Sequence, residues 1–162
     1  MVELSDDTSG AEQREKWIAL LKGGDFFSTF DHNDLNKLFD FGVIKKYAAN
    51  EYIIKENTNN TSIFVILVGT ASIIKNGGSA KMKKMITTVK TGECFGEMAL
   101  WLDGLRTASV LATRDCYVFI LSRDELEKMD LALQNKMLKR IAYAMALKIT
   151  EDTDRLAKTP FF

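Results

Sequence analysis

The first forty residues carry the apolar spacing of two amphipathic helices. Over residues 11–22 the apolar side chains recur at i, i+3 and i+4 and form one stripe: Trp17, Leu20 and Leu21. A second helix is predicted over residues 32–40, because its apolar residues share one face and Asp31 is a suitable N-cap. Glycines follow both segments, which indicates that both helices end there.

From residue 43 to 121 the pattern changes to short β-branched and aromatic runs separated by turn residues. The predicted strands contain Ile44, 52–54, 63–68, 71–74, 85–89 and 116–121. Asn76-Gly77-Gly78 is a strong hairpin signal between two of them. Many short strands at close spacing indicate a closed roll or a sandwich, so the fold class is α+β and mainly β.

Helical spacing returns after residue 122. Ser122 and Glu125 have the spacing of a capping box, which predicts that a helix starts there. A longer helix is predicted over residues 131–157, with a stripe that steps by four: Met137, Ile141, Met145 and Ile149. We expect this stripe to pack against the domain, and it also offers a seam for a homodimer or an effector protein.

Composition restricts the class of protein. The chain has 162 residues, 46% apolar and 27% charged, which suits one globular domain. Lys plus Arg equals Asp plus Glu at 22 each, so the basic footprint of a nucleic-acid-binding protein is missing. Because no apolar run is long enough to span a bilayer and the N-terminus is acidic, we expect no membrane contact and a cytoplasmic location. Cys94 and Cys116 are expected to be reduced thiols.

The most informative segment runs from Phe95 to Val110. It combines a glycine turn at Gly96, a carboxylate at Glu97, a short apolar helix and an arginine at Arg106. A carboxylate accepts hydrogen bonds from hydroxyls, and free N–H groups at a helix start favour an anion. An arginine fork can hold two phosphate oxygens. The chemistry of the segment therefore suits a sugar phosphate.

The same residues, FGEMALWLDGLRTASV, resemble the phosphate-binding cassette of cyclic-nucleotide-binding domains. These domains are the sensors of catabolite-activator-type regulators, of cyclic-nucleotide-dependent kinases and of gated channels. The resemblance extends over roughly residues 17 to 150. It implies an antiparallel β-roll, or jelly-roll-like barrel, flanked by N-terminal and C-terminal helices.

The resemblance also implies a domain plan. Residues 1–10 are expected to form a flexible tail and residues 11–157 a single domain. That domain divides into helices over 11–42, a β-roll over 43–121 containing the cassette 95–110, and helices over 122–157. Residues 158–162 are a tail or the start of a truncated repeat, since Leu156 precedes a Phe-Phe pair by five residues, as Leu21 does.

By resemblance and chemistry, seven residues are expected to bind the ligand: Gly96, Glu97, Met98, Ala99, Arg106, Thr107 and Ala108. Gly96 lets the backbone approach the ligand, and the N–H groups of the next turn face the phosphate. Arg106 neutralises the phosphate, while Glu97 accepts from the ribose 2′-hydroxyl. Thr107 and Ala108 line the phosphate and base side.

The chain departs from the family pattern at two turns in the first part of the roll and at one position of the cassette. Asn50 and Asn57 stand where the family usually has glycine, and asparagine tolerates the left-handed turn geometry that glycine adopts there. Leu105 replaces a frequent proline before the arginine. Thr107 permits cyclic GMP, because its hydroxyl can reach the guanine amino group, but it also occurs in domains that prefer cyclic AMP. We favour cyclic AMP slightly.

The predicted function is a non-catalytic sensor module, with a cyclic nucleotide as its ligand and neither a cofactor nor a metal. An enzyme is disfavoured, because His32 is the single histidine and has no nucleophile at motif spacing. Two cysteines cannot fill an iron–sulfur cluster. We expect no direct DNA contact, since the sequence ends at Phe162 without a helix-turn-helix. The alternative is a degenerate, ligand-free domain that serves as a protein-interaction scaffold.

Overall fold

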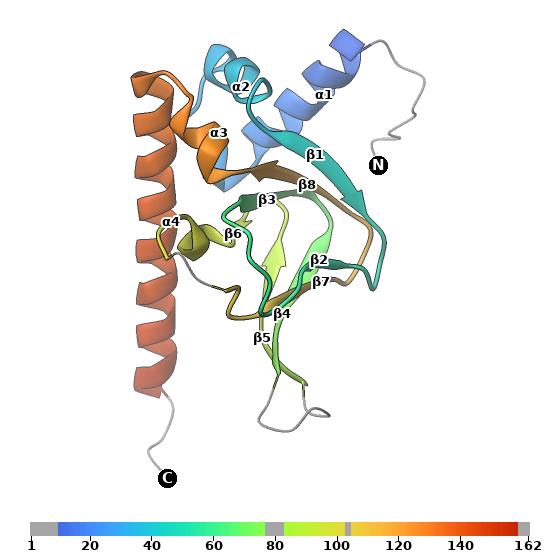
Figure 1. Cartoon of the computed structure of the whole chain (residues 1–162), viewed down its shortest axis with the longest axis vertical. Coiled ribbons are helices and arrows are strands. Elements are labelled where there is room, and N and C mark those ends of the chain that lie inside the picture. The colour runs from blue at the N-terminus through green and yellow to red at the C-terminus, as the bar shows by residue number, and fades with distance from the viewer. Residues whose placement is uncertain (1–9, 77–82, 103–104, 159–162) are drawn as a thin grey trace.

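The computed structural model describes residues 10–76, 83–102 and 105–158, which form a β-roll with helices at both ends (Figure 1). The elements are α1 (Gly10–Gly23), the 3-10 helix η1 (Asp25–Phe27), α2 (His32–Leu38), β1 (Val43–Tyr47), β2 (Tyr52–Ile54), β3 (Ile63–Val68), β4 (Thr70–Asn76), β5 (Lys83–Lys90), β6 (Cys94–Phe95), the 3-10 helix η2 (Glu97–Leu100), β7 (Ser109–Ala112), β8 (Cys116–Leu121), α3 (Arg123–Glu127) and α4 (Leu131–Lys158).

The strands form two four-stranded antiparallel sheets with the orders β1-β8-β3-β6 and β2-β7-β4-β5. In the described residues no ladder joins the two sheets, so the roll is open and the closed form of the prediction is wrong. The mainly β class is confirmed. The sequence pattern did not predict the short strands β6 and β7, because each is too short to show an alternation of apolar and polar residues.

Strand β3 explains why two layers cover the first sheet. Its sequence is an unbroken apolar run, and its first five residues are buried. Side chains alternate between the faces of a strand, so such a run has to be covered on both sides. Phe64 and Ile66 face the second sheet, whereas Ile63, Val65 and Leu67 face a helical layer.

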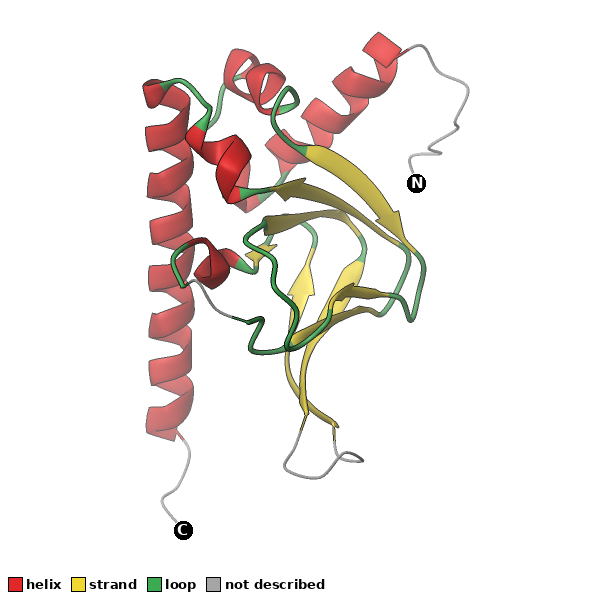
Figure 2. Cartoon of the chain, in the orientation of Figure 1, coloured by secondary structure: helices red, strands yellow, loops and turns green. Residues whose placement is uncertain are grey.

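Helices from both ends of the chain form the helical layer (Figure 2). The buried residues of α1, η1, α2 and the first three turns of α4 join one cluster with the outer face of β3 and β8: Trp17, Ile18, Leu21, Phe26, Phe27, Leu35, Leu38, Leu133, Met137 and Ile141. Within this cluster the ring of Phe27 meets that of Phe119 edge-on, with centroids 5.9 Å apart. The N-terminal half of α4 packs in this cluster, and this packing fixes the direction of the helix.

Most of the predicted helices are confirmed, with two corrections. Asp31 caps α2 in a complete capping box with Asp34. Ser122 caps α3 by accepting from the Glu125 N–H, but the Glu125 carboxylate pairs with Lys128, so the reciprocal half of the predicted box is wrong. The predicted stripe of α4 is buried only as far as Ile141; Ile149 is 65% exposed.

Some predictions fall outside the described residues. These are the tails at residues 1–9 and 159–162, and the glycines of the Asn76-Gly77-Gly78 turn. The two strands that flank this turn, β4 and β5, are paired antiparallel as a hairpin requires.

The two asparagines that replace family glycines adopt left-handed backbone geometry. The φ angle is 68° at Asn50 and 64° at Asn57. Asparagine is among the residues that tolerate this region best after glycine, so both turns form without a glycine. The Asn57 N–H donates to the Arg106 carbonyl at 2.8 Å, which ties the second turn to the end of the cassette.

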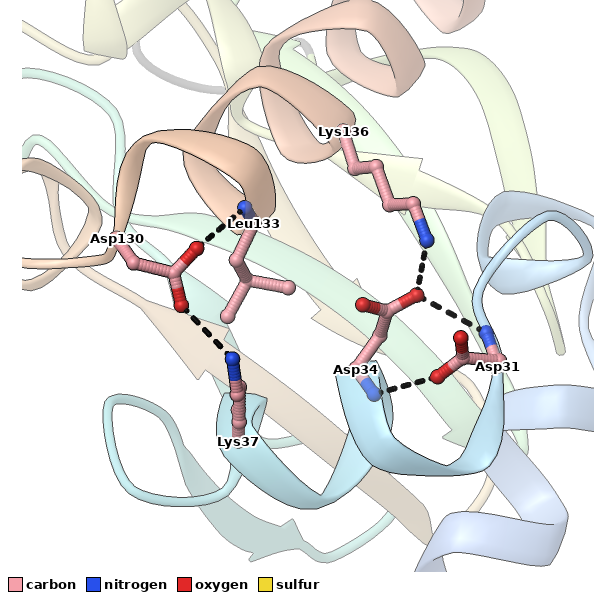
Figure 3. A network of polar contacts seen from close by, with 6 residues as sticks. All are labelled: Asp31, Asp34, Lys37, Asp130, Leu133 and Lys136. Atoms are coloured by element: carbon pink, nitrogen blue, oxygen red, sulfur yellow. Dashed lines mark hydrogen bonds and ion pairs between the residues drawn. The ribbon is translucent and has the colours of Figure 1, made fainter.

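A polar network fastens the start of α4 to α2 (Figure 3). The Asp130 carboxylate accepts from the Leu133 N–H and from Lys37 Nζ, both at 3.0 Å. The Asp34 carboxylate pairs with Lys136 and accepts from the Asp31 N–H. The Leu133 amide and the Lys37 ammonium hold the pKa of Asp130 below its ordinary value.

We expect this network to make stability acid-sensitive. Because the folded pKa of Asp130 is depressed, its contribution is complete above about pH 5 and is lost as pH falls through the folded pKa. Between about pH 5 and pH 2, the free energy of unfolding should therefore fall less steeply in Asp130→Asn than in the wild type. Urea denaturation at each pH measures this. The control, Asp154→Asn on the exposed part of α4, should keep the wild-type slope.

Candidate ligand-binding site

The cassette begins with a turn that only glycine fits well. After β6 the chain enters η2 through Gly96, whose φ and ψ are 76° and 8°. A Cβ atom on Gly96 would lie 2.8 Å from Nη1 of Arg106 and 3.1 Å from the Phe64 ring. The absence of a side chain therefore allows both the left-handed turn and the close approach of the arginine.

Arg106 is 5% exposed, and its guanidinium lies against backbone oxygens. Nη1 donates to the Gly96 carbonyl at 2.8 Å, while Nη2 donates to the Ser62 carbonyl at 2.5 Å and to Asn60 Oδ1 at 3.2 Å. The guanidinium also lies 5.4 Å from the centre of the Phe64 ring. These contacts hold the arginine between the start of β3 and the cassette turn.

The hydrogen bonds of Arg106 are incomplete. Nε is buried and has no acceptor in the part of the chain that the structure describes. Desolvation lowers the pKa of Arg106, and the nearby Glu97 charge opposes that shift. A buried N–H donor without a partner costs about 1–3 kcal/mol. The site therefore holds a cation with donor capacity left over for an anion.

The carboxylate of Glu97 is paired with the C-terminal helix. Glu97 is 5% exposed, and its Oε1 accepts from Lys148 Nζ of α4 at 2.8 Å. The same ammonium donates to the Cys94 carbonyl at 2.7 Å. Glu97 and Arg106 do not form an ion pair with each other, since Glu97 accepts from Lys148 and Arg106 donates to other oxygens.

A pocket of about 710 Å³ opens beside these two charges. Its walls come from the cassette, the inner face of the second sheet and one side of α4, with further residues from η1 and from the turn before β6. The sheet contributes apolar side chains, among them Ile54, Ile73, Val89 and Val110. The helix contributes Arg140, Tyr143, Ala144, Leu147 and Lys148. An apolar cavity of this size with a few convergent polar groups is typical of a small-molecule site.

The seven residues predicted from the sequence all line this pocket: Gly96, Glu97, Met98, Ala99, Arg106, Thr107 and Ala108. Glu97, Ala99 and Arg106 are buried, whereas Met98 and Thr107 are exposed. The Ala99 N–H, expected to face a phosphate, forms a long 3.3 Å bond to the Gly96 carbonyl. The assignment of these residues to a ligand stays a prediction.

Sequence reasoning missed the partners that hold the two charges. Asn60 and Ser62 precede β3 in a polar loop with no motif. Lys148 lies 51 residues beyond Glu97. Lys148 follows Ile141 by seven residues, which places it on the same face of the helix as the apolar stripe, so helical periodicity is the signal that could have found it.

His32 and Cys116 lie outside the pocket, whereas Cys94 lines it. His32 is exposed and lies 3.5 Å from Glu15, and no group of three or more potential metal ligands was found among residues 10–76, 83–102 and 105–158. Both cysteines are free, as predicted, and both are also buried; burial raises the pKa of Cys94 to about 12. No helix in this part of the chain is long and apolar enough to cross a membrane.

Comparison with protein families identifies the class. The family model described as "Cyclic nucleotide-binding domain" matches residues 44–130, more than half of the chain. The match covers the strands from β1 to β8, the cassette and α3. The chain therefore belongs to the cyclic nucleotide-binding domain family.

Curated relatives include kinases and kinase regulators. Mouse cGMP-dependent protein kinase 2 is 22% identical over 144 residues, which cover 89% of this chain and 19% of the relative. The cAMP-dependent protein kinase regulatory subunit of Emericella nidulans is 28% identical over 136 residues, 84% of this chain and 32% of the relative. The chain thus spans about a fifth to a third of these relatives.

Solved structures share the fold. A cyclic nucleotide-binding domain from Methylobacillus flagellatus has a TM-score of 0.79 at 24% identity, over 93% of this chain and 86% of that one. The regulatory domain of Toxoplasma gondii PKA, crystallised with cAMP, has a TM-score of 0.67 at 21% identity, over 82% of this chain and 51% of that one.

Gly96→Ala should destabilise the protein by about 1–3 kcal/mol, because the left-handed turn becomes strained and the new methyl group displaces Arg106. The matched control is Gly23→Ala, where a Cβ meets nothing within 4 Å. That variant should differ from the wild type by no more than about 0.5 kcal/mol. Equal losses in both variants, measured by urea denaturation, would contradict the special role of Gly96.

Proposed function

We propose that the chain is a cytoplasmic, non-catalytic sensor module that binds a cyclic nucleotide in the pocket beside the cassette. Cyclic AMP is slightly favoured over cyclic GMP. The observation that carries this proposal is Arg106, a buried cation that lines the pocket and keeps an unused Nε–H donor. The family membership of the chain supports the same ligand class.

In this proposal the cyclic phosphate takes the place next to Arg106. A cyclic phosphodiester carries one negative charge, so one guanidinium is enough to neutralise it. The Nε–H donates to one phosphate oxygen, and the N–H groups after Gly96 supply further donors. The phosphate thereby satisfies a donor that is otherwise buried and unpaired.

The ribose lies against Glu97, whose carboxylate accepts from the 2′-hydroxyl. A site built to bond a hydroxyl discriminates strongly against an analogue that lacks it, since its buried polar group is then left unpaired. The ligand is therefore a ribonucleotide, and 2′-deoxy analogues bind more weakly.

The base occupies the apolar part of the pocket between the second sheet and α4. Tyr143 and Leu147 of α4 and Ile86 of β5 are exposed apolar side chains at its rim. Thr107 is exposed and lines the same pocket, so its hydroxyl is available to a guanine amino group. This contact permits cyclic GMP without excluding cyclic AMP.

Binding is transmitted by a shift of the C-terminal helices against the roll. A full switch from 1:99 to 99:1 needs about 5.5 kcal/mol of differential affinity. A micromolar ligand has about 8 kcal/mol of total binding free energy, so a partial switch is within reach. The exposed C-terminal half of α4 then offers its surface to an effector protein or to a second copy, without direct DNA contact.

Cyclic AMP at a hundredfold excess over its dissociation constant should stabilise the wild type by about 2.7 kcal/mol, roughly 5–10 °C in Tm. Arg106→Ala should abolish this shift, because binding loses about 2–5 kcal/mol with the charge partner. Arg106→Lys, which keeps the charge and loses the fork, should weaken it. Thermal unfolding with cyclic AMP, cyclic GMP and the linear monophosphates measures all of these.

The control is Arg114→Ala, an exposed arginine outside the pocket, which should keep the wild-type shift. A folded wild type that responds to no cyclic nucleotide would refute the sensor and leave the ligand-free scaffold as the function.

A further inference from the structure

We propose that the open side of β5 is a docking surface for an extended, acidic segment of a partner protein. The segment adds to the second sheet as a fifth strand, and its carboxylates meet lysines of the β4–β5 hairpin. The surface is distinct from the pocket, because neither Lys75 nor Lys84, which carry its charge, lines the pocket.

The first observation is a long, open sheet edge. In the order β2-β7-β4-β5, β5 is paired on one side only within the described residues. It has eight residues, whereas the other edge strands, β1, β2 and β6, have five, three and two. Proteins often keep edge strands short, because an open edge presents unpaired N–H and C=O groups to any strand that approaches. β5 is long enough to pair with a segment of its own length.

The second observation is the separation of charge along the chain. Residues 57–92 contain five lysines and no aspartate or glutamate, although the whole chain has as many basic as acidic residues. Four of these lysines lie on β4 and β5 within the described residues, and all four are exposed: Lys75, Lys83, Lys84 and Lys90. The end of the hairpin that carries the first three projects beyond the rest of the roll (Figure 1). A projecting surface of one sign attracts a partner of the opposite sign.

The third observation is a pair of like charges that face each other. Lys75 and Lys84 are directly opposite in the β4–β5 ladder, an arrangement that destabilises a sheet. Within the described residues neither lysine forms an ion pair or a contact with an aromatic ring. The Glu56 carboxylate reaches the end of β4 but accepts from the Asn76 N–H, at 3.1 Å. The hairpin thus keeps two positive charges that its own packing does not use.

The lysines of β1, at the edge of the first sheet, provide a contrast. Lys45 Nζ lies 4.8 Å from the centre of the Tyr47 ring. Lys46 Nζ lies 3.9 Å from Asp115 Oδ2 and 5.7 Å from the centre of the Tyr117 ring. Lysines on an edge discourage pairing with another strand, and those of β1 also have partners within the fold. The facing lysines of the β4–β5 hairpin lack such partners and can meet the carboxylates of another chain.

The same lysines determine which strand can be added. Pairing β5 with the β5 of a second copy would bring the lysines of both strands together, so this self-association is disfavoured. A strand with a carboxylate at every second residue instead presents a row of negative charge to Lys84 and Lys75 along one face of the sheet. Met85 and Ile86, 63% and 45% exposed, offer apolar contacts beside this row. Backbone hydrogen bonds then supply affinity, and the charges supply specificity.

The probe that tests this surface is a peptide of alternating glutamate and valine, matched to the eight residues of β5. Titrated into the isotopically labelled protein without nucleotide, it should shift the NMR amide signals of residues 83–90 and slow their hydrogen exchange. Lys75→Thr/Lys84→Thr should weaken binding about fivefold, the equivalent of roughly 1 kcal/mol. This variant should stay folded, because it removes a like-charge contact and threonine suits a strand.

Two controls separate strand addition from charge attraction. Lys45→Thr/Lys46→Thr, on the edge strand β1, should bind the peptide as the wild type does. A peptide of the same sequence with every amide N-methylated keeps the charge but cannot donate to a strand, so it should not bind. Protection of residues 83–90 that depends on Lys75 and Lys84 supports the proposal.

Three results would overturn it. One is the absence of any shift at residues 83–90 with the peptide at millimolar concentration. A second is equal binding of the N-methylated peptide, which would reduce the effect to charge alone. The third is a response of β5 to vesicles of anionic phospholipid and not to the peptide, which would make the hairpin a membrane contact.

Discussion

The architecture depends on one constraint, the burial of β3 on both faces. An unbroken apolar strand cannot lie at the surface of a two-layer protein, so it needs a sheet on one side and helices on the other. The second sheet supplies the inner cover, and helices from both ends of the chain supply the outer one. Because the N-terminal half of α4 belongs to that outer cover, the rest of the helix is carried past the cassette. The α4 wall of the pocket therefore forms because the same helix covers the core over β3.

The cassette buries two opposite charges, Arg106 and Glu97, that do not pair with each other. Arg106 donates to the oxygens of Gly96, Ser62 and Asn60, and Glu97 accepts from Lys148. A buried charge without compensation would be prohibitively costly, so each partner is structurally necessary. None of the partners of Arg106 carries a formal charge. Its positive charge is therefore solvated by dipoles but not neutralised, which is the state that favours an incoming anion.

The sequence was sufficient for the features that depend on local patterns. Helical spacing predicted α1, α2 and α4, Asp31 predicted a cap, and the asparagines at 50 and 57 predicted left-handed turns that the structure confirms. The glycine, glutamate and arginine of the cassette predicted a ligand site through their chemistry and their resemblance to the family cassette, and all three line the pocket.

What the sequence could not provide were contacts set by the packing of distant segments. The partition of the strands into two open sheets depends on long-range pairing, and β6 and β7 exist only through their partners. Full burial of the α4 stripe stops at Ile141, although the apolar period continues to Ile149, because the following turns of the helix line the open pocket. Lys148 meets Glu97 because the direction of α4 is decided by core residues a turn or more away.

The two halves of α4 differ in the free energy needed to detach them from the roll, and this difference matters for a sensor. Removing a buried leucine, methionine or isoleucine from a core costs about 2–5 kcal/mol each, so detaching Leu133, Met137 and Ile141 together would cost about 6–15 kcal/mol, which is comparable to or larger than the roughly 8 kcal/mol of a micromolar ligand. Beyond Ile141 none of the residues of α4 is fully buried, and the ammonium end of the Lys148–Glu97 pair is 41% exposed. A ligand of ordinary affinity can therefore move the exposed end of α4 at a lower cost in free energy than the buried half. The helix is suited to respond at its exposed end while its anchored end keeps the fold intact.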